Sequence, residues 1–145
     1  MKTLHFSIKI NAPKEKVWDI MLTDKTYREW TAEFNPGSFY EGSWDKGSNI
    51  RFIGFEEDGK VSGMLGKIAE NKKYEFLSIE YTGVLEKGVE STPEGIVGSK
   101  ENYTFTQTDN ITELKIDLDS IDDYMDMMNE MWPKALKKLK ELCER

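Results

Sequence analysis

Cysteine, histidine and long apolar stretches are all scarce in this sequence. Cys143 is the only cysteine among 145 residues, so no intrachain disulfide can form, and a reducing cytoplasm is the expected location. His5 is the only histidine, which argues against a metal site and against a Ser-His-Asp arrangement. No stretch approaches the roughly 18 apolar residues of a membrane helix, and the alternating polarity of residues 1–10 is not typical of a signal peptide. We therefore expect no metal, no cofactor and no membrane partner.

Basic charge is also in short supply. The chain has 20 Lys and Arg residues against 27 Asp and Glu, which gives a formal net charge of −7. Nucleic acids and anionic membranes both need a basic patch, so neither is an expected partner. The glycines at 59, 63 and 66 form no phosphate-binding pattern. The length and the balance of 38% apolar to 32% charged residues predict one soluble domain over residues 1–145.

The apolar spacing near the C-terminus predicts one long helix over residues 120–145. Apolar residues recur there at intervals of three and one, which is the spacing of a single helix face. These residues are Ile121, Tyr124, Met125, Met128, Met131, Trp132, Ala135, Leu136, Leu139, Leu142 and Cys143. Ser120 and Asp123 together match a capping box, and Pro133 predicts a kink near Asn129. Such a helix needs an apolar surface on which to lie.

The rest of the chain predicts that surface. A half-buried strand is expected over 4–10, followed by a helix that begins at Asn11-Ala12-Pro13 and a short helix through 27–30. About six further strands are expected, at 39–44, 49–55, 60–70, 74–81, 102–108 and 111–119. Residues 84–99 are expected to be irregular, with a gating lid as one interpretation. Because strands joined by short turns pair antiparallel, we predict an α+β fold in which a curved sheet wraps around the terminal helix.

Several short motifs resemble START-like (SRPBCC, Bet v 1-like) domains. The opening of those domains is matched by Ile10-Asn11-Ala12-Pro13, Val17-Trp18, Thr23-Asp24 and Trp30. The branch named for the activator of a heat-shock chaperone's ATPase (AHSA-type domains) is matched by Gly42-Ser43-Trp44, Asn102-Tyr103-Thr104 and Trp132-Pro133-Lys134-Ala135-Leu136. The resemblance covers nearly the whole chain. It implies a helix-grip fold with a cavity between the sheet and the long helix.

The candidate site consists of methionines and aromatic residues that this fold would place around the cavity. Methionine adapts to varied apolar shapes, and Tyr and Trp combine an apolar body with a polar tip. The residues predicted to bind a ligand are Trp30, Phe39, Trp44, Met64, Tyr81, Tyr103, Met125, Met128 and Trp132. Ordinary core packing is the competing interpretation for each of them.

Three functions remain open at this point. The first is a monomeric module that binds a small hydrophobic or amphipathic molecule. The second, implied by the resemblance, is a protein-interaction module of the chaperone-regulator kind. The third is an enzyme such as a cyclase or dehydratase, which needs a buried acid or base that touches the cavity. Strand parity turns Glu80, the carboxylate considered for this role, away from the core, so no catalytic residue is predicted.

Overall fold

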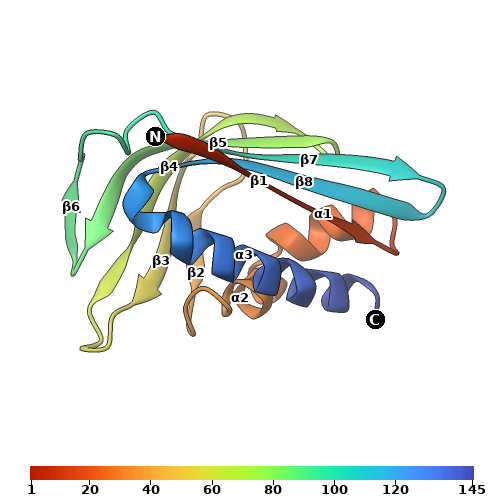
Figure 1. The fold of residues 1–145 in the computed structure, drawn as a ribbon, viewed down its shortest axis with the longest axis horizontal. Coiled ribbons are helices and arrows are strands. Elements are labelled where there is room, and N and C mark those ends of the chain that lie inside the picture. Colours follow the sequence, from red (N-terminus) through yellow and green to blue (C-terminus); the bar gives the residue numbers. More distant parts are fainter.

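The elements follow the order strand, two short helices, seven strands and one long helix (Figure 1). The computed structural model describes residues 1–145. The elements are β1 (Lys2–Ile10), α1 (Lys14–Leu22), α2 (Asp24–Thr31), β2 (Phe39–Gly42), β3 (Asn49–Phe55), β4 (Val61–Lys72), β5 (Phe76–Glu86), β6 (Val89–Ser91), β7 (Lys100–Thr108), β8 (Ile111–Ser120) and α3 (Asp122–Cys143). No helix is both long enough and apolar enough to cross a membrane.

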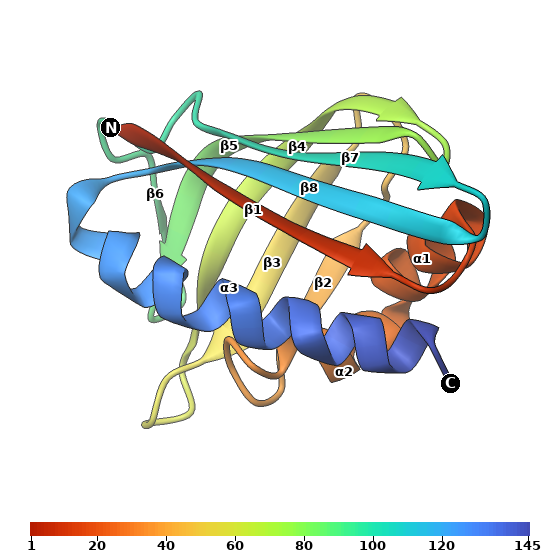
Figure 2. The same ribbon diagram turned by 45° about the vertical axis from the view of Figure 1, so that its right-hand side comes forward.

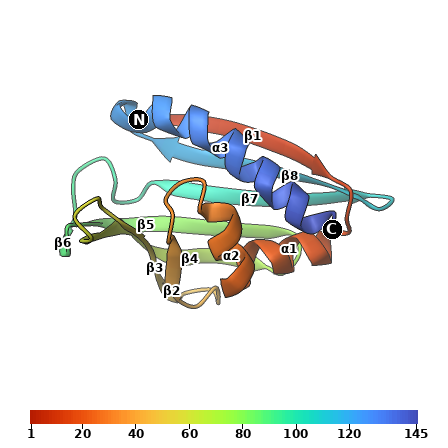
Figure 3. The same ribbon diagram turned by 90° about the horizontal axis from the view of Figure 1, so that it is seen from below.

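All eight strands belong to one antiparallel sheet that curves around α3 (Figure 2). The strand order is β1-β8-β7-β5-β4-β3-β2, and β6 pairs with β5 beside this path. Helices α1 and α2 lie near the C-terminal end of α3, and the two chain termini lie at opposite ends of the molecule (Figure 3). This arrangement confirms the predicted α+β helix-grip fold.

Alternating side chains explain why the sheet has one apolar face. In β8, Leu114, Ile116 and Leu118 are buried. Side chains of a strand point alternately to its two faces, so the residues between these three face outward. Leu118 and Ile116 lie opposite Leu4 and Phe6 of β1 in the strand register. The inward residues of neighbouring strands thus form a continuous apolar surface under α3.

Helix α3 is buried over its C-terminal half alone. Its buried residues are Trp132, Ala135, Leu136, Leu139, Leu142 and Cys143. No residue from Asp122 to Met131 is buried. The C-terminal half packs against β1, α1 and α2. The residues of the N-terminal half are only partly buried or exposed.

The predicted helix starts differ from those of the structure. Ile121 is the N-cap of α3 and no side chain caps the helix. The Ser120 hydroxyl donates instead to the Ile121 carbonyl oxygen over 3.0 Å, so the predicted capping box is wrong. Helix α1 likewise has Pro13 as its N-cap. Asn11 is outside the helix, and its backbone N–H donates to the Glu144 carboxylate over 2.8 Å.

The segment 84–99 is more regular than predicted. Strand β5 continues to Glu86, and β6 pairs with it antiparallel. The turn between them contains Lys87 at φ 48° and Gly88 at φ 83°. Two successive residues with positive φ make the tight turn that suits the right-handed twist of a hairpin. The hairpin was missed because Gly88 was interpreted as part of an irregular loop and because three-residue β6 is too short to show alternation.

Candidate functional site

A cavity of about 690 Å³ lies between the concave face of the sheet and the N-terminal half of α3. Its volume falls within the range of roughly 300–1,000 Å³ that is typical of small-molecule sites. Of its 35 lining residues 23 are hydrophobic, so it suits an occupant with a largely apolar body. Phe55, Tyr124 and Met127 line the cavity and are also exposed, which places them at its mouth.

Seven of the nine predicted site residues line this cavity. They are Trp30, Trp44, Met64, Tyr81, Tyr103, Met128 and Trp132. Phe39 lies outside it because the next residue of β2, Tyr40, takes the inward position and donates its hydroxyl to the Leu22 carbonyl oxygen. Phe39 instead packs against Phe55 and under the guanidinium of Arg28. Met125 packs against the core without lining the cavity. That the seven residues contact a ligand stays a prediction.

Trp132 joins the cavity to the aromatic core. Its ring centroid lies 5.0 Å from that of Phe34, and 6.0 to 6.2 Å from those of Phe6, Trp30 and Tyr103. The Trp30 indole N–H is already used, because it donates to the Met21 carbonyl oxygen over 3.0 Å. These interlocked rings make one wall of the cavity rigid and apolar.

A carboxylate lies on the sheet side of the cavity. The Tyr81 hydroxyl donates to Oε1 of Glu101 over 3.0 Å, and the Tyr103 hydroxyl donates to Oε2 through a short hydrogen bond. In the pairing of β5 with β7, Glu101 is opposite Ile79, so both tyrosines share its face of the sheet. No lysine, arginine or histidine pairs with Glu101.

Burial is the main cause of the pKa shifts of Glu101 and the tyrosines around it. Loss of solvent raises the pKa of Glu101, and the hydrogen bonds from Tyr103 and Tyr81 partly oppose that rise. Burial, and then the neighbouring charge of Glu101, raise the pKa values of Tyr81 and Tyr103 well above their usual range. The pKa of Tyr27 is raised for the same two reasons. The tyrosine hydroxyls therefore stay protonated and remain donors.

The charged residues around the cavity all have one sign. Four glutamates line it, and no lysine, arginine, histidine or aspartate does. Glu101 is partly buried, whereas Glu56, Glu86 and Glu94 are exposed. The cavity thus carries one inner carboxylate and three outer ones, and no opposing cation.

The sequence analysis missed Glu101 because it began the strand at Asn102. Strand β7 begins two residues earlier, at Lys100. This extension puts Glu101 in phase with Tyr103 and Phe105, whose side chains face inward. Continuing the alternation back from Tyr103 by two residues would have found it. Glu80 lies between the inward residues Ile79 and Tyr81, so it faces outward as predicted.

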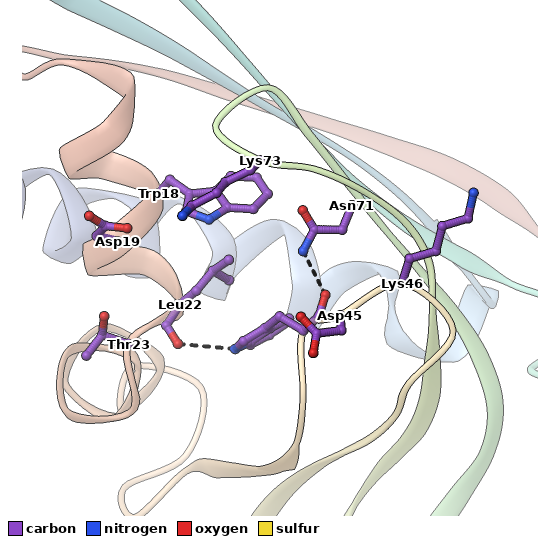
Figure 4. Close-up of a pocket in the computed structure, with 9 residues that line it drawn as sticks. Trp18, Asp19, Leu22, Thr23, Asp45, Lys46, Asn71 and Lys73 are labelled. Carbon is purple, nitrogen blue, oxygen red and sulfur yellow. Dashed lines mark hydrogen bonds between the residues drawn. The ribbon is translucent and has the colours of Figure 1, made fainter.

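A second, more polar hollow of about 490 Å³ lies between α1, the β2–β3 loop and the β4–β5 turn (Figure 4). It is lined by Trp18, Asp19, Leu22, Thr23, Trp44, Asp45, Lys46, Asn71 and Lys73. The Leu22 carbonyl oxygen accepts a hydrogen bond from the Trp44 indole N–H over 3.1 Å, and the Asn71 amide donates to the Trp44 carbonyl oxygen over 2.8 Å. These bonds tie the β2–β3 loop to α1 and β4, which is a structural role.

Several solved structures share this architecture. A protein from Mesorhizobium loti superposes with a TM-score of 0.73 at 16% identity, covering 97% of this chain and 96% of that one. The Aha1 dimer from Colwellia psychrerythraea gives a TM-score of 0.72 at 20% identity, covering 99% and 97%. A protein from Mycobacterium smegmatis gives 0.73 at 17% identity, covering 97% and 89%. At these identities the likeness shows the fold alone.

The sequence itself matches a known family over almost its full length. No functionally curated protein matches the chain significantly. Residues 11–144 match the family described as Activator of Hsp90 ATPase homolog 1-like protein. The match begins near the end of β1 and ends just after α3, so it includes every strand and helix that borders the cavity. The chain therefore belongs to the family of Activator of Hsp90 ATPase homolog 1-like proteins.

Proposed function

We propose that the protein binds a small, mainly apolar molecule in the cavity between the sheet and α3. The observation that carries this proposal is the cavity itself, about 690 Å³ with a mostly hydrophobic lining. Protein interiors are otherwise packed as densely as organic crystals, with few voids larger than a water molecule. An apolar space of this size beside a well-packed half of the same helix is more consistent with an occupant than with a packing defect.

Methionines give the cavity an adaptable wall. Met64 on β4 and Met128 and Met131 on α3 line it from two sides. Their unbranched side chains change shape at low cost, which favours apolar molecules of varied outline. The exposed residues Tyr124 and Met127 lie on the helix side of the mouth. Entry past the N-terminal half of α3 is the route that this arrangement favours.

A reaction of the cyclase or dehydratase type is the second candidate, and Glu101 is the observation that favours it. Such a reaction needs an acid or base that touches the bound molecule. Glu101 lines the cavity, and Tyr81 and Tyr103 hold its carboxylate in place. A bound molecule that is recovered chemically unchanged after long incubation would count against catalysis and leave binding intact.

A protein-interaction function has less support. It calls for an apolar or singly charged patch on the outer sheet face. The outward residues of β8 are Ile111, Glu113, Lys115, Asp117 and Asp119. Lys115 pairs with Glu113 at 3.6 Å, and Asp117 pairs with His5. Apart from the exposed Ile111, this strand presents polar side chains of both charge signs to the outer face. We accordingly expect the isolated chain to be a monomer.

Thermal unfolding with a panel of apolar molecules tests the proposed function. The variant Met128→Trp fills part of the cavity, and Asn129→Trp adds the same ring to the exposed face of α3 as a matched control. At a ligand concentration of 100 times the Kd, wild type and Asn129→Trp should gain about 2.7 kcal/mol, or roughly 5–10 °C in Tm. Met128→Trp should gain much less. The proposal fails if no molecule of the panel stabilises the wild type.

A further inference from the structure

The charges around the cavity discriminate between classes of apolar ligand. An anionic head group such as the carboxylate of a fatty acid would meet four glutamates and no basic residue. A cationic head group would meet opposite charge both at the mouth and inside. The net charge of −7 adds a long-range attraction of the same sign for cations. The electrostatics therefore favour a cation.

The Glu101 carboxylate can accept further hydrogen bonds from a ligand. An ionised carboxylate offers about four acceptor positions, and the hydroxyls of Tyr81 and Tyr103 occupy two of them. Even a partly buried carboxylate without a cationic partner is costly, since hydrogen bonds replace only part of its hydration. A ligand that supplies a positive charge would remove that cost.

The surrounding rings complement a positive charge as well. Tyr103 on one side of Glu101 lies 6.2 Å from Trp132, and Tyr81 on the other side lies 6.3 Å from Phe52, measured between ring centroids. All four rings line the cavity. The faces of aromatic rings attract ammonium groups, most strongly where water is excluded.

We propose that the cavity binds a hydrophobic amine, with the apolar body against the methionine and tryptophan side chains and the protonated amino group against the Glu101 carboxylate. This inference rests on the proposed function, and it adds the chemical class of the ligand. The two tyrosines orient the carboxylate, and the ammonium group takes its free acceptor positions. Charge repulsion disfavours anionic amphiphiles of the same size.

Three probes with one apolar body and different head groups test this proposal: 4-phenylbutylamine, 4-phenylbutanol and 4-phenylbutyrate. Calorimetric titration of the wild-type protein near pH 7 should give the amine at least about tenfold higher affinity than the alcohol, as expected for a charged hydrogen bond. The carboxylate should bind most weakly. Alcohol and amine binding with equal affinity would overturn the amine proposal while leaving the cavity function standing. Failure of all three probes to bind would overturn the amine proposal, and thermal unfolding with the apolar panel would then decide whether the cavity binds any molecule.

Two variants test whether the preference for the amine comes from Glu101 or from a glutamate at the mouth of the cavity. Glu101→Gln keeps the shape of the side chain and removes its charge, so the amine should lose about tenfold in affinity while the alcohol keeps its own. Glu94→Gln removes one exposed charge at the mouth and should leave most of the amine preference intact. An unchanged preference in Glu101→Gln, or an equal loss in both variants, would contradict the proposal. The comparison of the three probes on the wild-type protein decides the matter independently of both variants.

Discussion

At Glu101 we expect the requirements of stability and of ligand binding to conflict. Its carboxylate lines an otherwise mainly apolar cavity, is held by two tyrosines and has no cationic partner in the chain. Residues selected for stability alone are rarely buried charges without a partner. We therefore expect this side chain to cost stability at neutral pH and to be retained for what it binds.

The pH dependence of unfolding measures that cost. Because the pKa of Glu101 is raised above its ordinary value of 4.5, the folded protein holds this proton more tightly than the unfolded chain does. The stability from this group is full below pH 4.5 and is lost as the pH rises through the folded-state pKa. The groups known to face it are the hydroxyls of Tyr27, Tyr81 and Tyr103, which do not ionise in this range.

Glu101→Gln should consequently gain stability over the wild type between pH 4.5 and neutral pH. The expected gain is about 1.4 kcal/mol for each unit by which the pKa is raised. Urea unfolding of both proteins at several pH values gives the difference, and Glu94→Gln measures the background of an exposed site. A difference that is independent of pH would show that Glu101 has no such linkage.

For individual residues, the sequence analysis predicted most of the apolar lining of the cavity and missed its inner carboxylate, Glu101. Tyr103 could be placed because a family motif and strand parity both predicted an inward side chain, and Trp132 because a family motif and the helical apolar spacing did. Phe39 was predicted to face the cavity, but its neighbour Tyr40 takes the inward side of β2. Glu101 was missed because the end of a strand leaves no clear pattern, so its phase was never assigned.

At the scale of elements, the two halves of the continuous helix α3 have different surroundings. The C-terminal half supplies all the buried residues of the helix, and the N-terminal half lines the cavity. Its methionine-rich and leucine-rich halves were visible in the sequence. The position of the helix start was not, because Ile121 is the N-cap and no side chain marks it. The pairing of β6 with β5 also left no periodic signal.

The two halves should respond differently to the loss of side-chain volume. Leu139→Ala creates a void in the packed core and should cost about 2–5 kcal/mol of unfolding free energy. Met128→Ala enlarges an existing cavity and should cost less than about 1.5 kcal/mol, because its side chain is only partly buried. Equilibrium unfolding in urea compares the two variants. Equal costs would mean that the N-terminal half is packed as tightly as the C-terminal half.

At the scale of the whole molecule, the fold followed from the order and polarity of the elements. One alternating strand, two short helices, a series of hairpins and a long amphipathic helix leave few arrangements, because the apolar helix face and the apolar sheet face must cover each other. The open space between them did not follow from that argument. It depends on how far α3 stands from the sheet at its N-terminal half, which local patterns do not encode.

Ligand-induced shifts of the methionine methyl groups test the central claim most directly. The chain has seven methionines. Five of them line the cavity, among them Met64, Met128 and Met131 on facing walls, and Met1 is exposed elsewhere. In carbon-13 methyl NMR, titration with 4-phenylbutylamine should shift the signals of Met64, Met128 and Met131 together, with a common Kd, and leave Met1 unchanged. Binding without shifts at these three residues would contradict the account, because the ligand would then lie outside the space between the sheet and α3.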